Sequence, residues 1–529
     1  MVGSQWKGVS VITPYGELPN RLAQGMRMEE QHEWLQTQLT RRSLVAGVAV
    51  GASTVLAPTL WRQSSATGGV GLRGRHITYG ADPTTSLVVE FATVTPISSA
   101  TVRLLTTSRH QVATSRADLR TVRGSSRRYC RANFSGLRPD HTYIYEIVAN
   151  GHTVGSGRAQ TAFSDRRAFR FTAFGDQGTG RHPRSVLTRL EALNPRLHLM
   201  CGDLCYADSS GQGGPGDVFR PQLWDAWLAQ NDPAASHIPW LSVPGNHEME
   251  PGFATHGYAG YLTRVAPGGK SPLQIPVATA FQVGSVGFIG LDSNDVSYEI
   301  PANRGWTRGA QTRWLDETLT HYRAAGSGID QIVVFMHHAP YSTNNTHASE
   351  GGIIESWVPL FDKHTVDLVI SGHNHCYERV KPMRAGKVTG GGIGEVNSLA
   401  GTTYITAGGG GEGGEARFIP IAGKTRVAYA HGREVVNEDW SLPSKTTTPS
   451  VLAVDVTPAG GGRPSTLEVR ALAANGRTLD EVRLVRGTAA DATNSLTPWL
   501  VGGATVGIGG AAAAWGLSRR RTGGEVGVD

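Results

Sequence analysis

The 529-residue sequence predicts an α+β protein in which a β-sandwich is followed by a larger domain of alternating strands and helices. Residues 71–163 alternate apolar and polar side chains over short runs, such as Ser86–Phe91 and Thr142–Ile147. Several short strands separated by turn residues are typical of a sandwich. From Phe169 onward, compact apolar runs alternate with helical candidates. A chain of this length is too long for a single core, so we expect two or more domains.

The predicted elements of the second domain follow one another in a regular order. The strands that end at polar motifs are Phe169–Phe174, Leu197–Cys201, Trp240–Val243, Gln331–Met336 and Val366–Ile370. The helical candidates are Pro183–Leu193, Pro221–Gln230 and Gly309–Ala325. Further strands are expected at Phe281–Asp292, Thr402–Ala407, Leu452–Val456 and Thr466–Ala471. Residues 408–414 and 423–448 are rich in glycine or polar side chains and are expected to form surface loops near the mouth of a site.

Five short segments carry side chains that commonly bind metal ions. They are Gly175-Asp176-Gln177-Gly178, Gly202-Asp203-Leu204-Cys205-Tyr206, Gly245-Asn246-His247-Glu248, Val334-Phe335-Met336-His337 and Gly372-His373-Asn374-His375. Together they offer two carboxylates, a phenol, an amide oxygen and three imidazoles. Most follow directly after a β-rich run, where an open sheet presents its binding loops. This is the ligand set of two metal ions that share one bridging carboxylate, so we expect a hydrolase.

The five segments, in this order, resemble the metallophosphoesterase superfamily, and Tyr206 narrows the resemblance to the purple acid phosphatases. The motifs extend from about Phe169 to Gly411, and the preceding β-domain extends the resemblance back to Gly71. Within that domain, residues 136–143 resemble the loop and strand that open fibronectin type III domains. The resemblance implies a fibronectin III-like β-sandwich without metal ligands, followed by a four-layer α/β/β/α metallophosphoesterase domain. In that domain two mixed sheets would stack face to face, flanked by helices.

The resemblance also implies which residues hold the two metal ions. Carried over to the matching positions, the ligands are Asp176, Tyr206 and His375 for the first ion, Asn246, His337 and His373 for the second, and Asp203 as the bridge. A phenolate ligand is costly at neutral pH unless the ion is strongly Lewis acidic, so we expect Fe³⁺ in the first position. The second position would take a divalent ion (iron, zinc or manganese), and the sequence does not choose among them.

The implied reaction is hydrolysis of phosphate monoesters by direct attack of a metal-bound hydroxide. His247 is the best candidate for the group that protonates the leaving group, and His347 matches a second histidine that faces the substrate. Plant members place two adjacent histidines there, whereas this chain has Thr346 before His347, which favours a likeness to bacterial members. His338 and Asp292 are expected to support the site through hydrogen bonds.

Each motif alone has an ordinary structural explanation. A Gly-Asp pair after a strand often caps a turn or helix, a lone tyrosine is more often a core residue, and two histidines can flank an ordinary loop. The joint occurrence of all five motifs favours the metal site. Two other functions remain open, namely a phosphodiesterase or nucleotidase of the same fold and a catalytically inactive surface-binding protein. Loops near residues 211–216 and 347–352 would decide between a monoester and a diester.

The charge of the chain gives no support to nucleic-acid binding. Its formal net charge is +7, but residues 1–66 contribute +2 and residues 499–529 contribute +1, which leaves +4 for the middle. No run of lysine or arginine with interleaved aromatic side chains occurs there. The expected substrates are therefore small-molecule phosphate esters.

Both ends of the chain suggest export. Within residues 1–66, the pair Arg41-Arg42 precedes a mildly apolar run to Leu60 and looks like a twin-arginine signal, which the twin-arginine export machinery would recognise. The sequence Ser64-Ser65-Ala66 suits cleavage, and a buried Ala/Gly helix is the alternative.

The C-terminal end contains a second apolar stretch. Residues 499–518 form a candidate transmembrane helix, which a stalk (488–498) precedes and a short cytoplasmic tail (519–529) follows. We therefore expect domains at 67–165 and 166–487 in an exported bacterial protein that is secreted or held at the extracellular face of the membrane.

The four cysteines do not form a disulfide framework in so long a chain. Cys130 lies in a predicted strand and is expected to be a small core side chain. A bridge between Cys205 and Cys376 stays open at this point.

Overall fold

The computed structural model describes residues 11–13, 16–18, 70–213, 218–344, 346–412 and 424–487. The strands β1 (Val11–Thr13) and β2 (Gly16–Leu18) form a short antiparallel pair. The rest of the N-terminal extension, the stalk, the candidate membrane helix and the tail lie outside the described residues. Within the described ranges no helix is long and apolar enough to cross a membrane. The domain boundaries inferred from sequence stay predictions.

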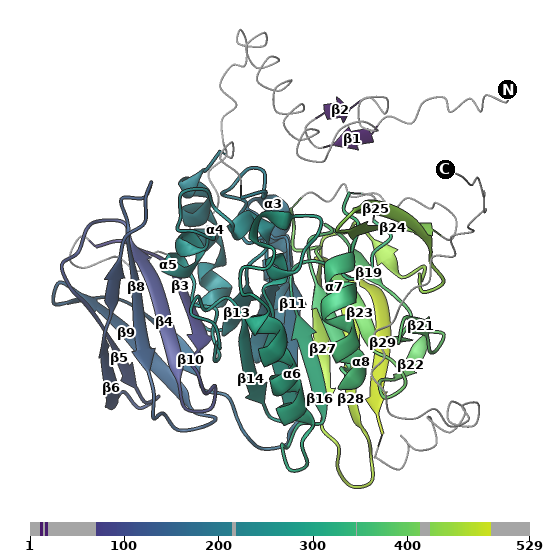
Figure 1. The fold of residues 1–529 in the computed structure, drawn as a ribbon. Helices are drawn as coiled ribbons and strands as arrows, with labels where there is room; N and C mark the ends of the chain where they lie inside the picture. Colours follow the sequence, from purple (N-terminus) through teal and green to yellow (C-terminus); the bar gives the residue numbers. More distant parts are fainter. Residues whose placement is uncertain are drawn as a thin grey trace, which may run out of the picture.

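The N-terminal domain is a β-sandwich of two four-stranded antiparallel sheets (Figure 1). One sheet has the order β3-β4-β8-β7, formed by Leu72–Tyr79, Leu87–Thr93, Arg128–Phe134 and Asp118–Arg120. The other has the order β10-β9-β5-β6, formed by His152–Gln160, Thr142–Ala149, Ala100–Leu105 and Gln111–Arg116. Alternate residues of β9 are buried, as the alternation in the sequence predicts, because successive side chains of a strand point to opposite faces.

Two seven-stranded sheets make up the second domain. The first has the order β13-β12-β11-β27-β28-β29-β22, formed by Trp240–Val243, Leu197–Cys201, Phe169–Phe174, Ser450–Thr457, Ser465–Ala473, Thr478–Arg486 and Gly394–Asn397. The second has the order β14-β15-β16-β18-β23-β19-β26, formed by Thr279–Val283, Val286–Gly290, Gln331–Phe335, Leu368–Ser371, Thr403–Ala407, Tyr377–Arg379 and Lys445–Thr446. Strands β11, β12 and β13 are parallel, as are β15, β16, β18 and β23, so their carboxyl ends point the same way within each sheet.

The sheets stack face to face, and helices cover both outer faces (Figure 1). Phe171 of the first sheet packs edge-on against Phe288 of the second, with ring centroids 5.1 Å apart. The helices α3 (Arg181–Leu193), α4 (Pro221–Ala235) and α5 (Ala259–Arg264) pack on the outer face of the first sheet. The helices α6 (Ala310–Arg323), α7 (Gly351–Ser356) and α8 (Val358–Lys363) pack on the second. The predicted four-layer α/β/β/α fold is confirmed.

Three local predictions differ from the structure. The strand expected over residues 281–292 is the hairpin β14–β15, which turns at Gly284 with φ +55°. Helix α4 continues past Gln230 to Ala235, since its Pro233 falls in the last turn and Ala234 and Ala235 are buried there. The expected loop over 423–448 contains the hairpin β24–β25 (Lys424–Tyr429 and Gly432–Asn437). Strand β24 also pairs with β17 (Ser349–Glu350), and the sequence of β17 has no pattern that predicts a strand.

The remaining elements are short. They are η1 (Asn246–Glu248), η2 (Ser293–Asp295), η3 (Pro301–Asn303) and the strand pair β20 (Met383–Arg384) and β21 (Lys387–Val388).

A buried carboxylate joins the sandwich to the second domain. Glu90 of β4 pairs with His76 at 2.9 Å and with Arg131 at 2.5 Å, and it accepts the backbone N–H of Ala266 at 2.8 Å. Arg131 also donates to the carbonyl of Leu262 in α5 at 2.8 Å. Burial alone would raise the pKa of Glu90, but the charges of Arg131 and His76 lower it from 4.5 to about 2. The ionised carboxylate therefore stabilises the contact between the two domains.

We expect Glu90→Gln to lower the free energy of unfolding at pH 7 by about 3 kcal/mol, since the pKa shift of this buried group has roughly that energetic equivalent. Because the folded pKa lies below the unfolded value, this stabilisation is complete above pH 4.5 and disappears as the pH falls toward 2. Urea unfolding of the variant and the wild type at pH 7 and pH 3 measures both effects. Glu395→Gln, which removes an exposed ion pair with Arg483, should change stability by less than about 1 kcal/mol. An equal decrease in the free energy of unfolding in both variants would contradict the prediction.

Candidate metal centre

The predicted ligands lie in loops at the carboxyl ends of parallel strands. Asp176 follows β11, Asp203 follows β12, His337 follows β16 and His373 follows β18. Three of these four, Asp176, Asp203 and His373, adopt left-handed backbone conformations with φ between +51° and +67°, as does Tyr206 at +56°. Such conformations cost energy in residues other than glycine and are typical of functional sites, where the surrounding structure imposes them.

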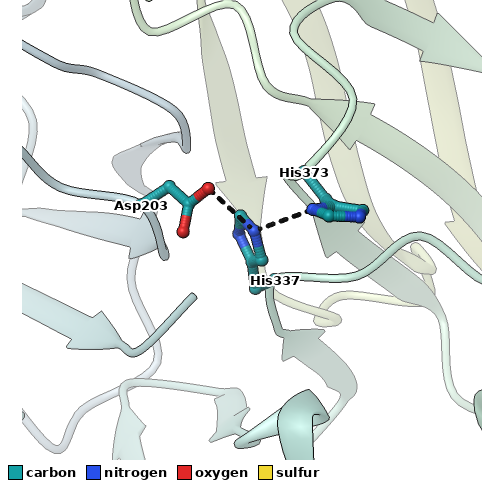
Figure 2. Close-up of side chains that lie close together, drawn as sticks. All are labelled: Asp203, His337 and His373. Carbon is teal, nitrogen blue, oxygen red and sulfur yellow. Dashed lines mark hydrogen bonds and ion pairs between the residues drawn. The ribbon is translucent and has the colours of Figure 1, made fainter. Parts of the chain in front are cut away.

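The ligands predicted for the second metal ion converge on one nitrogen atom. The Nε2 atom of His337 lies 3.2 Å from Asp203 Oδ2 and 3.2 Å from His373 Nδ1 (Figure 2). The same nitrogen lies 2.8 Å from Asn246 Oδ1. All four side chains are buried. His337 Nδ1 lies 2.8 Å from the carbonyl oxygen of Cys201, so it donates its proton there and holds the ring with Nε2 directed into the cluster. The four side chains thus direct ligand atoms at a common point.

This cluster attracts positive charge. Burial would lower the pKa of His337, but the carboxylates of Asp203 and Asp176 raise it from 6.5 to about 9. The pKa of Asp203 shifts the other way, since burial would raise it while the charges of His337 and His247 hold it well below 3.8. A carboxylate that stays ionised beside several imidazoles is the environment that a divalent cation requires.

The ligands predicted for the first metal ion lie beside this cluster. The hydroxyl of Tyr206 donates to Asp176 Oδ1 at 3.2 Å and lies 2.9 Å from His375 Nε2. Ligand atoms of Asp176, Asp203 and His375 all lie within 4.8 Å of one another. Burial, together with the negative charges of Asp176 and Asp203, raises the pKa of Tyr206 well above 10. A phenolate at this position therefore requires a strongly Lewis-acidic ion, and Fe³⁺ stays a prediction from the sequence.

Glycines form the walls around the ligands. A Cβ atom on Gly245 would lie 2.1 Å from Asp203 Oδ1, one on Gly372 would lie 2.5 Å from Asp176 Oδ2, and one on Gly202 would lie 2.6 Å from His337 Nδ1. The backbone therefore approaches the ligand atoms more closely than any side chain would allow. Carboxylate, imidazole, amide and phenol donors inside such a cradle fit two cations of the iron, zinc or manganese type.

Glu248 holds two of the ligand loops together. Its carboxylate accepts the backbone N–H groups of Asp203 at 2.8 Å, Leu204 at 2.9 Å and Gly245 at 2.7 Å. The side chain is completely buried, and burial together with the charge of Asp203 raises its pKa to about 7. Glu248 is the last residue of the third motif and was assigned no ligand or catalytic role from the sequence, whereas the structure shows that it fixes the position of Asp203.

Two partly exposed histidines flank the centre. His247 Nδ1 lies 2.8 Å from the carbonyl oxygen of Asp208, so Nδ1 carries a proton, and Nε2 faces the centre 3.9 Å from Asp203 Oδ2. The ring of His347 stacks on that of His373, with centroids 3.8 Å apart. The side chains of His247 and His347 are 16 % and 14 % exposed, so both are accessible from solvent. The structure thus brings all nine predicted site residues to one place.

His338 and Asp292 lie behind this site. His338 is buried, with Nδ1 2.8 Å from Ser293 Oγ. Asp292 accepts the hydroxyl of Tyr258 and the indole N–H of Trp306, both at 2.9 Å. Burial raises the pKa of Asp292 to about 7. Neither side chain faces solvent, as the sequence predicts for residues that support the site.

Glu299 lies at the site although no motif in the sequence includes it. This carboxylate lies between η2 and η3, outside all five motifs, and its atoms group with those of His347 and His373 within 4.8 Å. No periodic pattern or motif marks it in the sequence. The structure also settles the cysteine pairing that the sequence left open, because Cys205 and Cys376 are free buried thiols, as are Cys130 and Cys201.

Two family models match the chain. Residues 73–171 match the N-terminal domain of purple acid phosphatases, and residues 169–377 match the calcineurin-like phosphoesterases. An uncharacterized protein of Mycobacterium tuberculosis is 33% identical over 411 residues, which cover 69% of this chain and 75% of the relative. Purple acid phosphatase 23 of Arabidopsis thaliana is 27% identical over 318 residues, covering 56% of this chain and 65% of the relative. Among solved structures, a purple acid phosphatase from yellow lupin (Lupinus luteus) seeds superposes with a TM-score of 0.63 at 18% identity, covering 80% and 76% of the two chains, which shows the same fold.

We expect Gly245→Ala to displace the Asp203 carboxylate, because the new Cβ would lie 2.1 Å from Oδ1 with backbone close on the same side. The purified variant should therefore lose metal during gel filtration that the wild type retains, because removing ligand support typically costs about 10–100-fold in metal affinity. Elemental analysis after gel filtration measures it. Gly391→Ala, where the added methyl group meets no atom within 4 Å, is the matched control and should bind metal normally. Full metal content in Gly245→Ala would show that the Asp203 position is not critical.

Proposed function

Because this chain belongs to the purple acid phosphatase family and is a phosphoric monoester hydrolase, we propose that it is an exported enzyme that hydrolyses small-molecule phosphate monoesters at the centre between its two sheets. The observation that carries the proposal is the convergence of ligand atoms on His337 Nε2, beside two accessible histidines. The fold implies a dinuclear metal site, and the candidate clusters among the described residues supply the ligands for it.

The two metal positions share the residue Asp203. Proposed ligands are Asp176, Tyr206 and His375 for Fe³⁺ and Asn246, His337 and His373 for divalent iron, zinc or manganese, with Asp203 as the bridge. When bound, two such ions supply Lewis acidity and an activated water for in-line displacement at phosphorus. The buried, glycine-lined cradle supports this assignment, because it fixes the ligand atoms before substrate arrives.

His247 is placed to move a proton. Its Nδ1–H is held by the carbonyl of Asp208, so proton exchange with the substrate takes place at Nε2, which faces Asp203. In its protonated form His247 would donate from Nε2 to the leaving-group oxygen. His347 lies on the other side of His373 and would donate a hydrogen bond to a phosphate oxygen. The two histidines therefore divide proton transfer and orientation between them.

The export part of the proposal rests on sequence alone. Arg41-Arg42 and the apolar run after them favour the twin-arginine machinery, which transports folded proteins and would allow metal loading in the cytoplasm. Residues 499–518 and the arginines that follow favour attachment to the membrane with the catalytic domain outside. Both segments lie outside the described residues.

We expect the metal-loaded full-length protein to favour a chromogenic phosphomonoester over its matching diester by at least about tenfold in kcat/KM, a difference of about 1.4 kcal/mol in transition-state binding. Parallel steady-state assays of the two substrates measure the ratio. A preference for the diester would make the chain a phosphodiesterase or nucleotidase. No turnover of either substrate by protein with two bound metal ions would favour an inactive binding protein.

His247→Asn should lower kcat by about 10²–10⁴-fold for a substrate with a poor leaving group, such as an alkyl phosphate, because this is the usual cost of losing a general acid. The metal content should stay at the wild-type level, because His247 is not a proposed ligand. His431→Asn, which alters an exposed histidine paired with Glu434, is the matched control and should leave kcat unchanged. A loss of less than about threefold in His247→Asn would exclude His247 as the proton donor.

A further inference from the structure

Glu299 is a buried carboxylate that touches two imidazoles of the site at once. Its Oε1 lies 3.3 Å from His347 Nδ1, and its Oε2 lies 3.7 Å from His373 Nε2. The side chain is only 1 % exposed. Neither imidazole has another acidic partner at these nitrogen atoms among the described ion pairs. Glu299 therefore lies between a proposed metal ligand and a proposed substrate-binding histidine.

The contact with His373 determines which of its nitrogen atoms is free to bind a metal ion. His373 Nδ1 faces the cluster of ligand atoms, 3.2 Å from His337 Nε2. A neutral imidazole carries one proton, so a lone pair at Nδ1 requires the proton at Nε2. His373 Nε2 is buried and has no hydrogen-bond partner among the described residues, and Glu299 is the acceptor that faces it. The negative charge of Glu299 thus favours the tautomer that can bind metal through Nδ1.

The contact with His347 acts in the same way on the other side. His347 Nδ1 directs a proton at Glu299 Oε1, and the doubly protonated ring also donates from Nε2 to a substrate oxygen. Because the two rings stack at 3.8 Å, one carboxylate at their shared edge fixes both orientations together. A carboxylate can accept from both imidazoles, whereas an amide has only one accepting oxygen.

Glu299 is itself held rigidly. Arg433 of β25 donates to Oε1 at 2.8 Å, and the backbone N–H of Ala348 donates to Oε2 at 3.0 Å. The backbone N–H groups of Tyr298 and Glu299 donate in turn to the buried carboxylate of Glu350, at 2.7 Å and 3.2 Å. The segment therefore cannot turn Glu299 away without breaking several hydrogen bonds.

We propose that Glu299 is a positioning residue that selects the metal-binding tautomer of His373 and orients His347, so that one carboxylate sets both the affinity of the second metal position and the placement of substrate. The proposal rests on the proposed function, because it takes His373 as a ligand of the second ion. Arg433 extends this role to the β24–β25 hairpin, which holds Glu299 against the site. The adjacent guanidinium also opposes a third cation at Glu299, although Glu299, His347 and His373 would otherwise supply a set of ligand atoms.

The test compares Zn²⁺ binding by metal-free full-length wild type and Glu299→Gln, measured by competition with a chromophoric chelator. We expect two equivalents in both proteins, with the weaker one lost at about 10–100-fold lower chelator concentration in Glu299→Gln and the tighter one unchanged. Glu299→Asp keeps the charge on a shorter side chain and should recover part of the affinity. At saturating Zn²⁺, kcat of Glu299→Gln for a phosphomonoester should stay below the wild-type kcat, because the carboxylate that orients His347 is still missing.

The matched control is Glu355→Gln. Glu355 accepts a hydrogen bond at 2.7 Å from the hydroxyl of Tyr298, the residue that precedes Glu299, but it contacts neither imidazole. Both zinc affinities and kcat of Glu355→Gln should therefore match wild type. Unchanged zinc affinities in Glu299→Gln, or equal weakening of both equivalents, would overturn the proposal. A third equivalent bound by wild type and lost in Glu299→Gln would replace it with a cation site. Because zinc binding is measured without substrate, a wild type that binds zinc as expected but hydrolyses no monoester would refute the proposed function alone.

Discussion

The position of the Asp203 carboxylate is the constraint on which the rest of the site depends. One of its oxygens accepts the backbone N–H of His247 at 3.0 Å, and the other lies 3.2 Å from His337. Its own backbone N–H is held by Glu248, and its φ of +51° turns the side chain toward both proposed metal positions. A single residue therefore ties the loop after β12 to the loop after β13 and to the strand end of β16. Any shift of Asp203 changes both halves of the centre.

Backbone hydrogen bonds between the loops offset the conformational strain of the left-handed residues. The strained loop after β11 is fixed by N–H groups of Asp176, Gln177 and Gly178, which donate to the carbonyls of Gly202, Asp203 and Leu204 at 3.0–3.1 Å. The loop after β18 is attached to the strand end of β16 by the bond from Gly372 to the carbonyl of His337 at 2.8 Å. Because the N–H groups of one loop donate to the carbonyl oxygens of another, tertiary structure as well as local preference imposes the left-handed conformations. The cradle is thus formed by the folded protein itself.

Much of this was readable from sequence because the signals are local. An apolar run that ends at Gly-Asp or Gly-His predicts both a strand and the loop after it, so Asp176, Asp203 and His373 could be assigned to the end of a sheet. Glu299 and Glu90 could not be found this way, because Glu299 gains its role from His347, 48 residues away, and Glu90 contacts the second domain through Ala266, 176 residues away. The hairpin β24–β25 was missed for the same reason, since its partner β17 is a two-residue strand without a pattern of its own. The proposed metal ligands can be recognised from sequence motifs, whereas the residues that position them can be recognised only in the folded structure.

The same distinction explains what the sandwich contributes. It supplies none of the proposed ligands, yet its Glu90 and Arg131 bond to Ala266 and Leu262, at the end of α5. Within α5, the hydroxyl of Tyr261 lies 2.8 Å from Ser242 Oγ on β13, four residues before the proposed ligand Asn246. Hydrogen bonds at either side of α5 thus connect the sandwich to β13, the strand that precedes a proposed ligand of the second metal ion. The sandwich therefore supports β13 and, through it, the loop that carries Asn246.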